Sequence, residues 1–247
     1  MRLGPYLIDV VDVELELVED MLGTAPANPE TYRDIIIRRM EEHYGVVKPA
    51  LVNEELGTLP RDEELQRPGV TVFHRDSRGV FVFDYHIKGY LKEIANKFKE
   101  TFGITAMRDK VESYVYVFPR RVYVTDDRGN PLREPTGQMT RPLRAMTMQG
   151  PRSTIVVSEV VPAGSRLAFE VRVYQNGMKK GDEIRPDTVL ALLQFGESQG
   201  LGQWRTGGWG RFKVVRFAIK EADVPWKGRE FRNAQDLLAE EPVSSRA

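Results

Sequence analysis

The sequence contains no cysteine, and only three of its 247 residues are histidine. The first absence excludes disulfide bonds, thiolate nucleophiles and cysteine-bound zinc, and the second leaves few ligands for a metal or haem. No apolar run approaches the roughly 20 residues that span a bilayer, and the N-terminus lacks the basic start and long apolar core of a signal peptide. We therefore expect a cytoplasmic protein with no membrane partner, no metal and no cofactor.

A net charge is also missing, because 36 basic residues balance 36 acidic ones. This balance excludes a positive field over the whole surface, so a basic surface for nucleic acid must come from local segregation of charge. One segment shows such segregation. Residues 120–152 contain seven arginines and three acids, which is an excess of four positive charges.

The amino-terminal part of the chain predicts a strand, a helix and an irregular arm. Apolar and acidic residues alternate over Tyr6–Glu19, which is typical of a strand with one buried face. Asn28 and Pro29 form a start signal for a helix over Glu30–Tyr44. Residues 45–69 are polar, and their apolar residues follow neither a helical nor a strand period. Proline and glycine interrupt the segment, so we expect an insertion or a flexible arm there.

The middle of the chain predicts a hairpin, an amphipathic helix and several strands. Two apolar alternating runs around a polar turn predict the hairpin over Val70–Tyr85. The helix predicted over His86–Phe102 carries Lys88 and Lys92 on its polar side. Strands are also predicted over residues 111–125, 154–161 and 166–174, the last two as a hairpin around residues 162–165.

The most unusual segment is Gly200–Gly210, where five of eleven residues are glycine and two are tryptophan. Glycine loses the most conformational freedom on folding, so this cluster indicates unusual backbone angles or a close approach. Arg205 occupies the place of the third glycine in a dinucleotide fingerprint, and Gly208 occupies the place of the lysine in a phosphate loop, so both motifs fail. The pattern that fits is G-x-G-x5-G-x-G, from Gly200, Gly202, Gly208 and Gly210.

This spacing resembles the glycine-rich loop of the RAMP superfamily, the RNA-binding subunits and processing nucleases of CRISPR systems. In that family the loop lies between the last helix and the last strand of a ferredoxin-like unit. The context is similar here, because Arg185–Phe195 predicts a helix and Arg211–Lys220 predicts a strand. The chain is also similar to uncharacterised prophage proteins with the same pattern, so a CRISPR or a phage setting stays open.

The resemblance implies an α+β fold with a ferredoxin-like (RRM-like) core and an antiparallel sheet. We expect this core over residues 1–220, with insertions at about 45–69 and 126–152, and a C-terminal extension over 221–247. The arginine-rich segment resembles the extended hairpin, or thumb, that RAMP backbone subunits push between nucleotides. Arginine neutralises phosphates and stacks on bases, and apolar side chains can separate stacked bases. The alternative is a structural loop whose arginines pair with the acidic first strand.

Lys88 and Gly89 resemble a strand-to-helix junction of the same subunits, where the lysine approaches the RNA backbone. The first hypothesis is therefore a non-catalytic subunit that binds single-stranded RNA or DNA, mainly by electrostatics. The family implies head-to-tail copies of the chain or other RAMP-like subunits as further partners. The expected contacts are Lys88, Lys92, Arg141, Arg144, Arg152, Gly200, Gly202, Trp204, Arg205, Gly208, Gly210 and Lys213.

Two other hypotheses remain open. The chain resembles metal-independent endoribonucleases that process CRISPR repeat RNA, in which case His43 is the candidate for proton transfer. His43 also suits the end of a helix, where the dipole favours a positive charge. The third hypothesis is a structural or assembly protein that uses a borrowed fold for protein contacts. For the glycine segment itself, the alternative to a binding loop is a turn held by two buried tryptophans.

Overall fold

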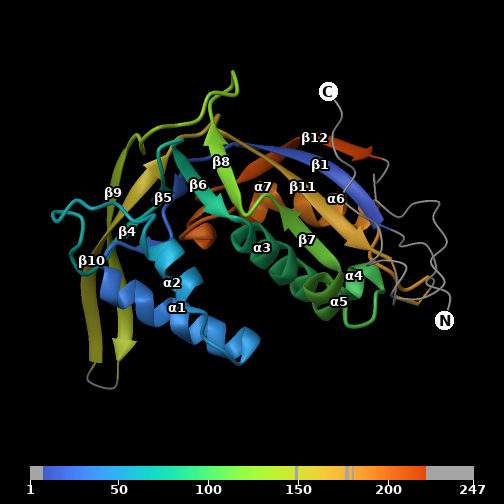
Figure 1. Ribbon diagram of the computed structural model, residues 1–247, viewed down its shortest axis with the longest axis horizontal. Helices are drawn as coiled ribbons and strands as arrows, with labels where there is room; N and C mark the ends of the chain where they lie inside the picture. Colours follow the sequence, from blue (N-terminus) through green and yellow to red (C-terminus); the bar gives the residue numbers. More distant parts are fainter. Residues whose placement is uncertain (1–7, 148–149, 176–177, 180, 221–247) are drawn as a thin grey trace, which may run out of the picture.

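The computed structural model describes residues 8–147, 150–175, 178–179 and 181–220. This part of the chain has an α+β fold with two largely antiparallel sheets (Figure 1). No helix within it is long and apolar enough to cross a bilayer. The α+β class expected from the sequence is confirmed.

The strand with alternating apolar and acidic residues is β1 (Ile8–Leu17), inside the larger, seven-stranded sheet. Its Val11, Val13 and Leu15 side chains are buried, as the alternation predicts. The sheet runs in the order β12–β1–β11–β8–β6–β5, and β7 also pairs with β11. The bounds are β5 His74–Arg75, β6 Val80–Phe83, β7 Val115–Phe118, β8 Arg121–Thr125, β11 Arg166–Tyr174 and β12 Phe212–Lys220.

Four of these strands, in the order β12–β1–β11–β7, are each antiparallel to their neighbours. One group of helices precedes β7 in the chain, and a second group connects β11 to β12. The first group is α3 (Asp84–Lys97), α4 (Lys99–Phe102) and α5 (Met107–Tyr114). The second is α6 (Pro186–Gln194), α7 (Gly196–Gln199) and the short 3-10 turn η1 (Arg205–Gly207).

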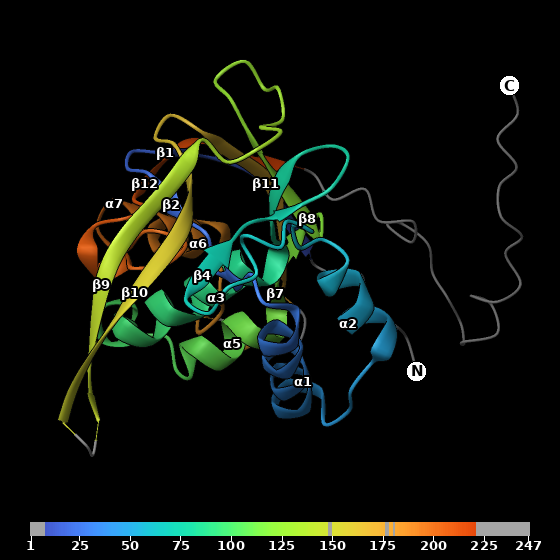
Figure 2. The ribbon, with the colours of Figure 1, turned by 90° about the vertical axis from the view of Figure 1, so that its left-hand side faces the viewer.

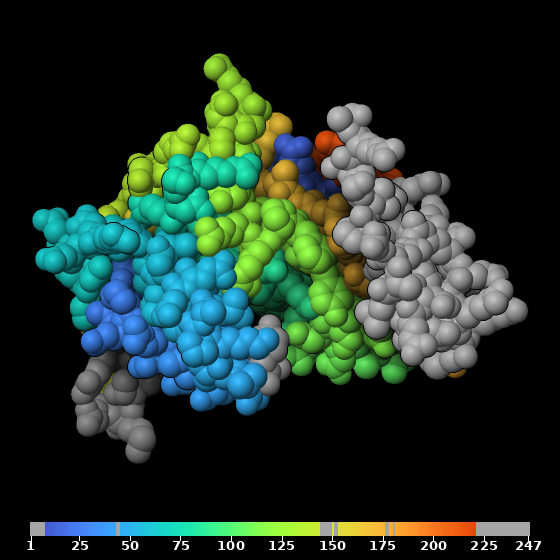
Figure 3. Space-filling view, in the orientation of Figure 1, coloured from blue at the N-terminus to red at the C-terminus, as the bar shows by residue number. Residues whose placement is uncertain are grey.

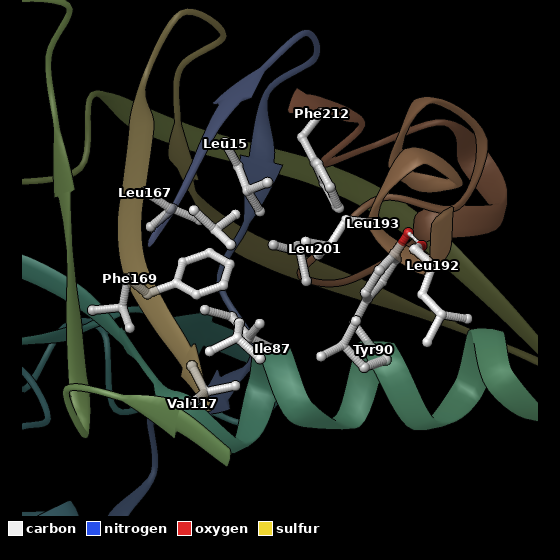
Figure 4. Packing of buried hydrophobic residues seen from close by; sticks show 14 of the residues in the cluster. Leu15, Ile87, Tyr90, Val117, Leu167, Phe169, Leu192, Leu193, Leu201 and Phe212 are labelled. Atoms are coloured by element: carbon white, nitrogen blue, oxygen red, sulfur yellow. Dashed lines mark hydrogen bonds between the residues drawn. The ribbon is translucent and has the colours of Figure 1, made fainter. Parts of the chain in front are cut away.

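Apolar side chains fill the space between this sheet and the helices (Figure 4). Phe169 of β11 and Ile87 of α3 point into this core, and so does Leu201 of the glycine segment. The Tyr90 hydroxyl donates a hydrogen bond of 3.1 Å to the carbonyl oxygen of Leu192, which satisfies a buried polar group. Because Leu201 is buried here, the glycine segment is anchored in the main core.

The second sheet joins two segments that are far apart in the sequence. Its order is β2–β10–β4–β3, with β9 paired to β10. Strand β10 lies parallel to β4, with Ser158 opposite Thr71 in the register. Figure 2 shows β9 and β10 side by side as a long ribbon. The bounds are β2 Met21–Leu22, β3 Ala25–Pro26, β4 Val70–Val72, β9 Gly137–Thr147 and β10 Gly150–Val161.

A smaller apolar cluster lies under helices α1 (Pro29–Tyr44) and α2 (Pro49–Leu56). The predicted start of α1 is confirmed, because the Asn28 side chain accepts a hydrogen bond of 2.9 Å from the Thr31 amide. The flexible arm expected over residues 45–69 is wrong for α2, whose Val52 side chain is buried in this cluster. A proline early in this segment begins the helix, since the first helical turn tolerates its missing N–H.

Three further predictions of local structure need correction. Residues 111–114 were expected in a strand but form the end of α5, where Val111 is buried against the core. The helix expected over 86–102 is divided into α3 and α4 at Phe98. The strands expected as a hairpin over 154–161 and 166–174 belong to different sheets, and the turn at 162–165 carries the chain between them. Packing between distant segments overrides the local pattern in each case.

Candidate nucleic-acid interface

The glycine segment forms a loop that is packed against its own chain. Gly200, Gly202, Gly208 and Gly210 all have positive φ angles, between 58° and 90°. A Cβ atom on Gly202 would lie 2.6 Å from the Leu22 carbonyl oxygen, and one on Gly210 would overlap the Leu201 carbonyl. The Leu201 amide donates to the Gly210 carbonyl oxygen at 2.8 Å. Close approach of the loop to its own chain therefore accounts for several of these glycines.

The outer part of the loop presents an aromatic ring. Trp204 has a positive φ of 52° and is 43% exposed. The Trp209 ring lies nearly parallel to it, with the ring centres 6.1 Å apart. A Cβ atom on Gly207 would lie 2.6 Å from the Trp204 indole, so glycine at that position makes room for the ring. A simple structural turn would bury both tryptophans, and Trp204 is exposed, so the segment is not such a turn.

A cation from the second sheet lies beside this ring. The Arg141 guanidinium, from β9, is 4.7 Å from the centre of the Trp204 ring, and its Nη2 donates to Gln203 Oε1 at 3.0 Å. Arg141 is only 9% exposed, and its Nε is buried without a hydrogen-bond partner. No carboxylate pairs with it within the described residues, and burial lowers the pKa of its guanidinium. A buried charge without a counter-charge costs free energy. The site formed by Arg141, Gln203 and Trp204, called the Arg141 corner below, is therefore suited to an anion.

Polar groups from three elements hold the corner in place. The Thr71 hydroxyl of β4 donates to Ser158 Oγ of β10 at 2.9 Å. The Ser158 hydroxyl in turn donates to Gln203 Oε1 at 3.4 Å, the same oxygen that accepts from Arg141. The glycine loop and strands β4 and β10 therefore together fix the position of the guanidinium.

Two other expected contacts are neutralised inside the chain. Arg205 forms an ion pair of 2.6 Å with Glu93 of α3. Lys213 of β12 forms an ion pair of 2.7 Å with Glu16 of β1, and its hydrogen bond lowers the pKa of that carboxyl. Because both partners are acids of the same chain, these cations differ from Arg141 in having their charge already balanced.

Lys88 and Lys92 face α5, and they line a cleft to which the glycine loop contributes no residue. The Lys88 ammonium donates to the Glu112 carbonyl oxygen at 2.7 Å and lies 4.5 Å from the centre of the Tyr116 ring. Lys92 forms an ion pair with the Glu112 carboxylate. The structure therefore does not bring these two lysines together with Arg141 and the loop.

The remaining expected residues are located by their backbone. Arg144 of β9 is opposite Ser153 in the hairpin register, and Arg152 of β10 is opposite Ala145. Since strand residues alternate between faces, the register assigns position 152 to the same face of the hairpin as position 141, and position 144 to the other face. His43 lies in the last turn of α1.

Sequence reasoning missed a buried polar network that joins α1, α2, β5 and α3. Glu55 is 1% exposed and accepts hydrogen bonds from Arg39 at 2.6 Å, Tyr32 at 2.9 Å and Tyr85 at 3.0 Å. The Tyr32 hydroxyl also lies 3.0 Å from Nε2 of His74. These residues follow no spacing along the chain, so no sequence signal identifies the network. Its hydrogen bonds within the chain are those of a structural element.

No family model matches the chain, and no curated protein matches it. Among solved structures, it is similar to a chain described as "Cryo-EM structure of the Type III-B Cmr-beta bound to cognate target RNA". The TM-score is 0.37 and the identity is 14%, over 86% of this chain and 60% of that chain. The chain thus spans less than two thirds of that chain's length. This is a loose likeness of fold.

Proposed function

We propose that this protein is a non-catalytic subunit that binds single-stranded nucleic acid, with RNA as the favoured ligand. The observation that carries this proposal is the buried Arg141 guanidinium, which has no acidic partner in the described residues and lies against the exposed Trp204 ring. A phosphate group of the strand would supply the missing negative charge. A neighbouring base would contact the exposed part of the indole, against which the Arg141 guanidinium and the Trp209 ring already lie.

The hairpin of β9 and β10 extends this contact surface. By the register, Leu143, which is 47% exposed, and position 152 share the face of the hairpin that carries position 141, whereas Ile155, which is 66% exposed, and position 144 lie on the other face. A surface of arginine and apolar side chains suits a single strand, whose phosphates and bases are both accessible. We expect binding that depends strongly on salt and weakly on base sequence.

We further propose that the chain is a RAMP-like subunit of a CRISPR-effector-like or phage ribonucleoprotein, with a ferredoxin-like core. The antiparallel order β12–β1–β11–β7, with α3 and α6 as its two helices, supports such a core. The loop falls between the last helix and the last described strand, where the resemblance expects it. On this proposal, further copies of the chain or other RAMP-like subunits are its partners.

The experiment compares the Arg141→Met variant with an Arg108→Met control, which also removes one arginine but from the exposed surface of α5. Fluorescence anisotropy measures the affinity of each protein for a labelled single-stranded RNA over a salt series. We expect Arg141→Met to bind about tenfold more weakly, with a salt slope reduced by about one, and the control to bind like the parent. Parent-like binding by Arg141→Met, or no binding by the parent at low salt, would contradict the proposal.

A further inference from the structure

The cleft lined by Lys88 and Lys92 has a volume of about 360 Å³ and lies between the α1–α2 unit and the part formed by α3, α5 and β7. Figure 3 shows the surface hollowed between α2 and β7. Its volume is at the lower end of the range of about 300–1,000 Å³ that is usual for small-molecule sites. Because no residue of the glycine loop lines it, a ligand here would occupy a site separate from the Arg141 corner.

Positive charge exceeds negative charge in this cleft. Four cations, Arg39, Lys88, Lys92 and Arg120, line it together with three carboxylates, Glu55, Asp84 and Glu112.

The carboxylates are held by partners in the chain. Glu55 accepts from Arg39 at 2.6 Å, and Glu112 pairs with Lys92. The Asp84 carboxylate accepts from the Tyr85 amide at 2.9 Å. The acids of the cleft are therefore committed to internal contacts. Arg120 pairs with Glu54 at 3.3 Å and with Glu55 at 3.4 Å, so its charge is also balanced.

Lys88 is the cation of the cleft that forms no salt bridge with a carboxylate within the described residues, although the nearby Glu112 and Asp84 carboxylates favour its charged form. Its ammonium donates to the Glu112 carbonyl oxygen and lies over the Tyr116 ring, while burial lowers its pKa. An ammonium group has three N–H donors, and the carbonyl takes one of them. An anionic group entering the cleft would accept the others and offset the cost of burying the charge.

An aromatic wall adjoins this lysine. Tyr116 and Phe118 alternate along β7 with the buried Val115 and Val117, and they are 41% and 37% exposed. Residues two apart on a strand lie on the same face, about 7 Å apart. The Arg172 guanidinium lies 4.4 Å from the centre of the Phe118 ring. The exposed parts of the two rings offer a planar ligand an apolar surface next to a cation.

We propose that this cleft binds a nucleotide, with its phosphate at Lys88 and its base against Tyr116. The phosphate would accept from the lysine that forms no salt bridge in the described residues, and the base would contact the exposed part of the Tyr116 ring. The ligand is a nucleotide with a terminal phosphate, either free or at the end of a strand. The proposal does not depend on strand binding at Arg141.

The test is isothermal titration calorimetry of the full chain with AMP and UMP, and with adenosine and inorganic phosphate. We expect the two nucleotides to bind at least tenfold more tightly than adenosine or phosphate. The Lys88→Met variant should lose at least tenfold in affinity, and the Tyr116→Ser variant should lose severalfold. Lys99→Met, on exposed α4, is the matched control and should bind like the parent.

Three outcomes would overturn the proposal: no binding of either nucleotide, parent-like binding by the Lys88→Met and Tyr116→Ser variants, or phosphate binding as tightly as AMP. A trinucleotide with a 5′-phosphate identifies the source of the ligand. If it binds more tightly than AMP, the cleft holds a strand end, and if AMP binds more tightly, the cleft holds a free nucleotide. Arg141→Met should leave AMP binding unchanged, so failure of this site and failure of the strand site are distinguishable.

Discussion

The Arg141 guanidinium lies 4.7 Å from the centre of the Trp204 ring, although one residue belongs to β9 and the other to the loop before β12. The ring and the Gln203 side chain are the contacts of this cation, and no carboxylate joins them in the described residues. A cation–π contact contributes about 0.5–2 kcal/mol, whereas burying an ion costs several kcal/mol. Arg141 is therefore expected to lower the stability of the free protein.

The Arg141→Met substitution should increase the free energy of unfolding by about 1 kcal/mol, because it replaces a buried charge by an apolar chain of similar length. Urea unfolding followed by circular dichroism measures this change. Arg108→Met, on the exposed surface of α5, should change stability by less than about 0.5 kcal/mol. A clear loss of stability in Arg141→Met would instead indicate a structural role for this arginine.

Glu55→Gln should lower the free energy of unfolding by about 3–5 kcal/mol, because it removes the charge that compensates the half-buried Arg39. The exposed Glu63 lies in the same stretch of chain, so Glu63→Gln is the matched control and should have almost no effect. Thermal unfolding of the two variants provides the comparison. Equal melting temperatures would show that the network around Glu55 does not stabilise the fold.

Stability should fall between pH 7 and pH 5 because of His74. Burial, together with the nearby His86, Arg39 and Arg121, lowers its pKa to about 3 from an ordinary value of 6.5. The neutral ring in the folded state therefore stabilises the protein above pH 6.5, and this stability is lost as the unfolded state takes up a proton. For one such histidine the loss of stability reaches about 2 kcal/mol at pH 5. Urea titrations at both pH values should show a smaller loss for His74→Gln than for the parent, and an equal loss would refute this assignment.

Gly210→Ala should destabilise the protein far more than Gly208→Ala. Both positions have positive φ angles, but a Cβ at Gly210 would overlap the Leu201 carbonyl, whereas the nearest atom to one at Gly208 is 3.5 Å away on the Arg211 side chain. We expect a cost of about 1 kcal/mol for Gly208→Ala, from its backbone angle alone. Yields of folded protein and melting temperatures would test the difference. Similar values for the two variants would mean that the loop is loosely packed.

Local signals in the sequence predicted elements whose start or buried face is set by a local pattern. The Asn28–Pro29 start of α1, the alternation of β1 and the helix before the glycine loop are examples. The pairing of β4 with β10 places residue 71 opposite residue 158, and no local pattern in the sequence connects these two positions. The candidate site was predicted in part, since Arg141 and Trp204 were both named but their contact was not. Ion pairs such as Arg205 with Glu93 could not be foreseen, because the partner acid is chosen by the fold.

The parallel pairing of β4 with β10 has a consequence for how this architecture can vary among species. One strand comes from the stretch between β1 and α3, and the other from the stretch between β8 and β11. Deleting either stretch alone would leave the other with bare amide and carbonyl groups along an open sheet edge, which invites aggregation. Relatives of this chain should therefore keep both stretches or lose both, and their lengths should be inherited together.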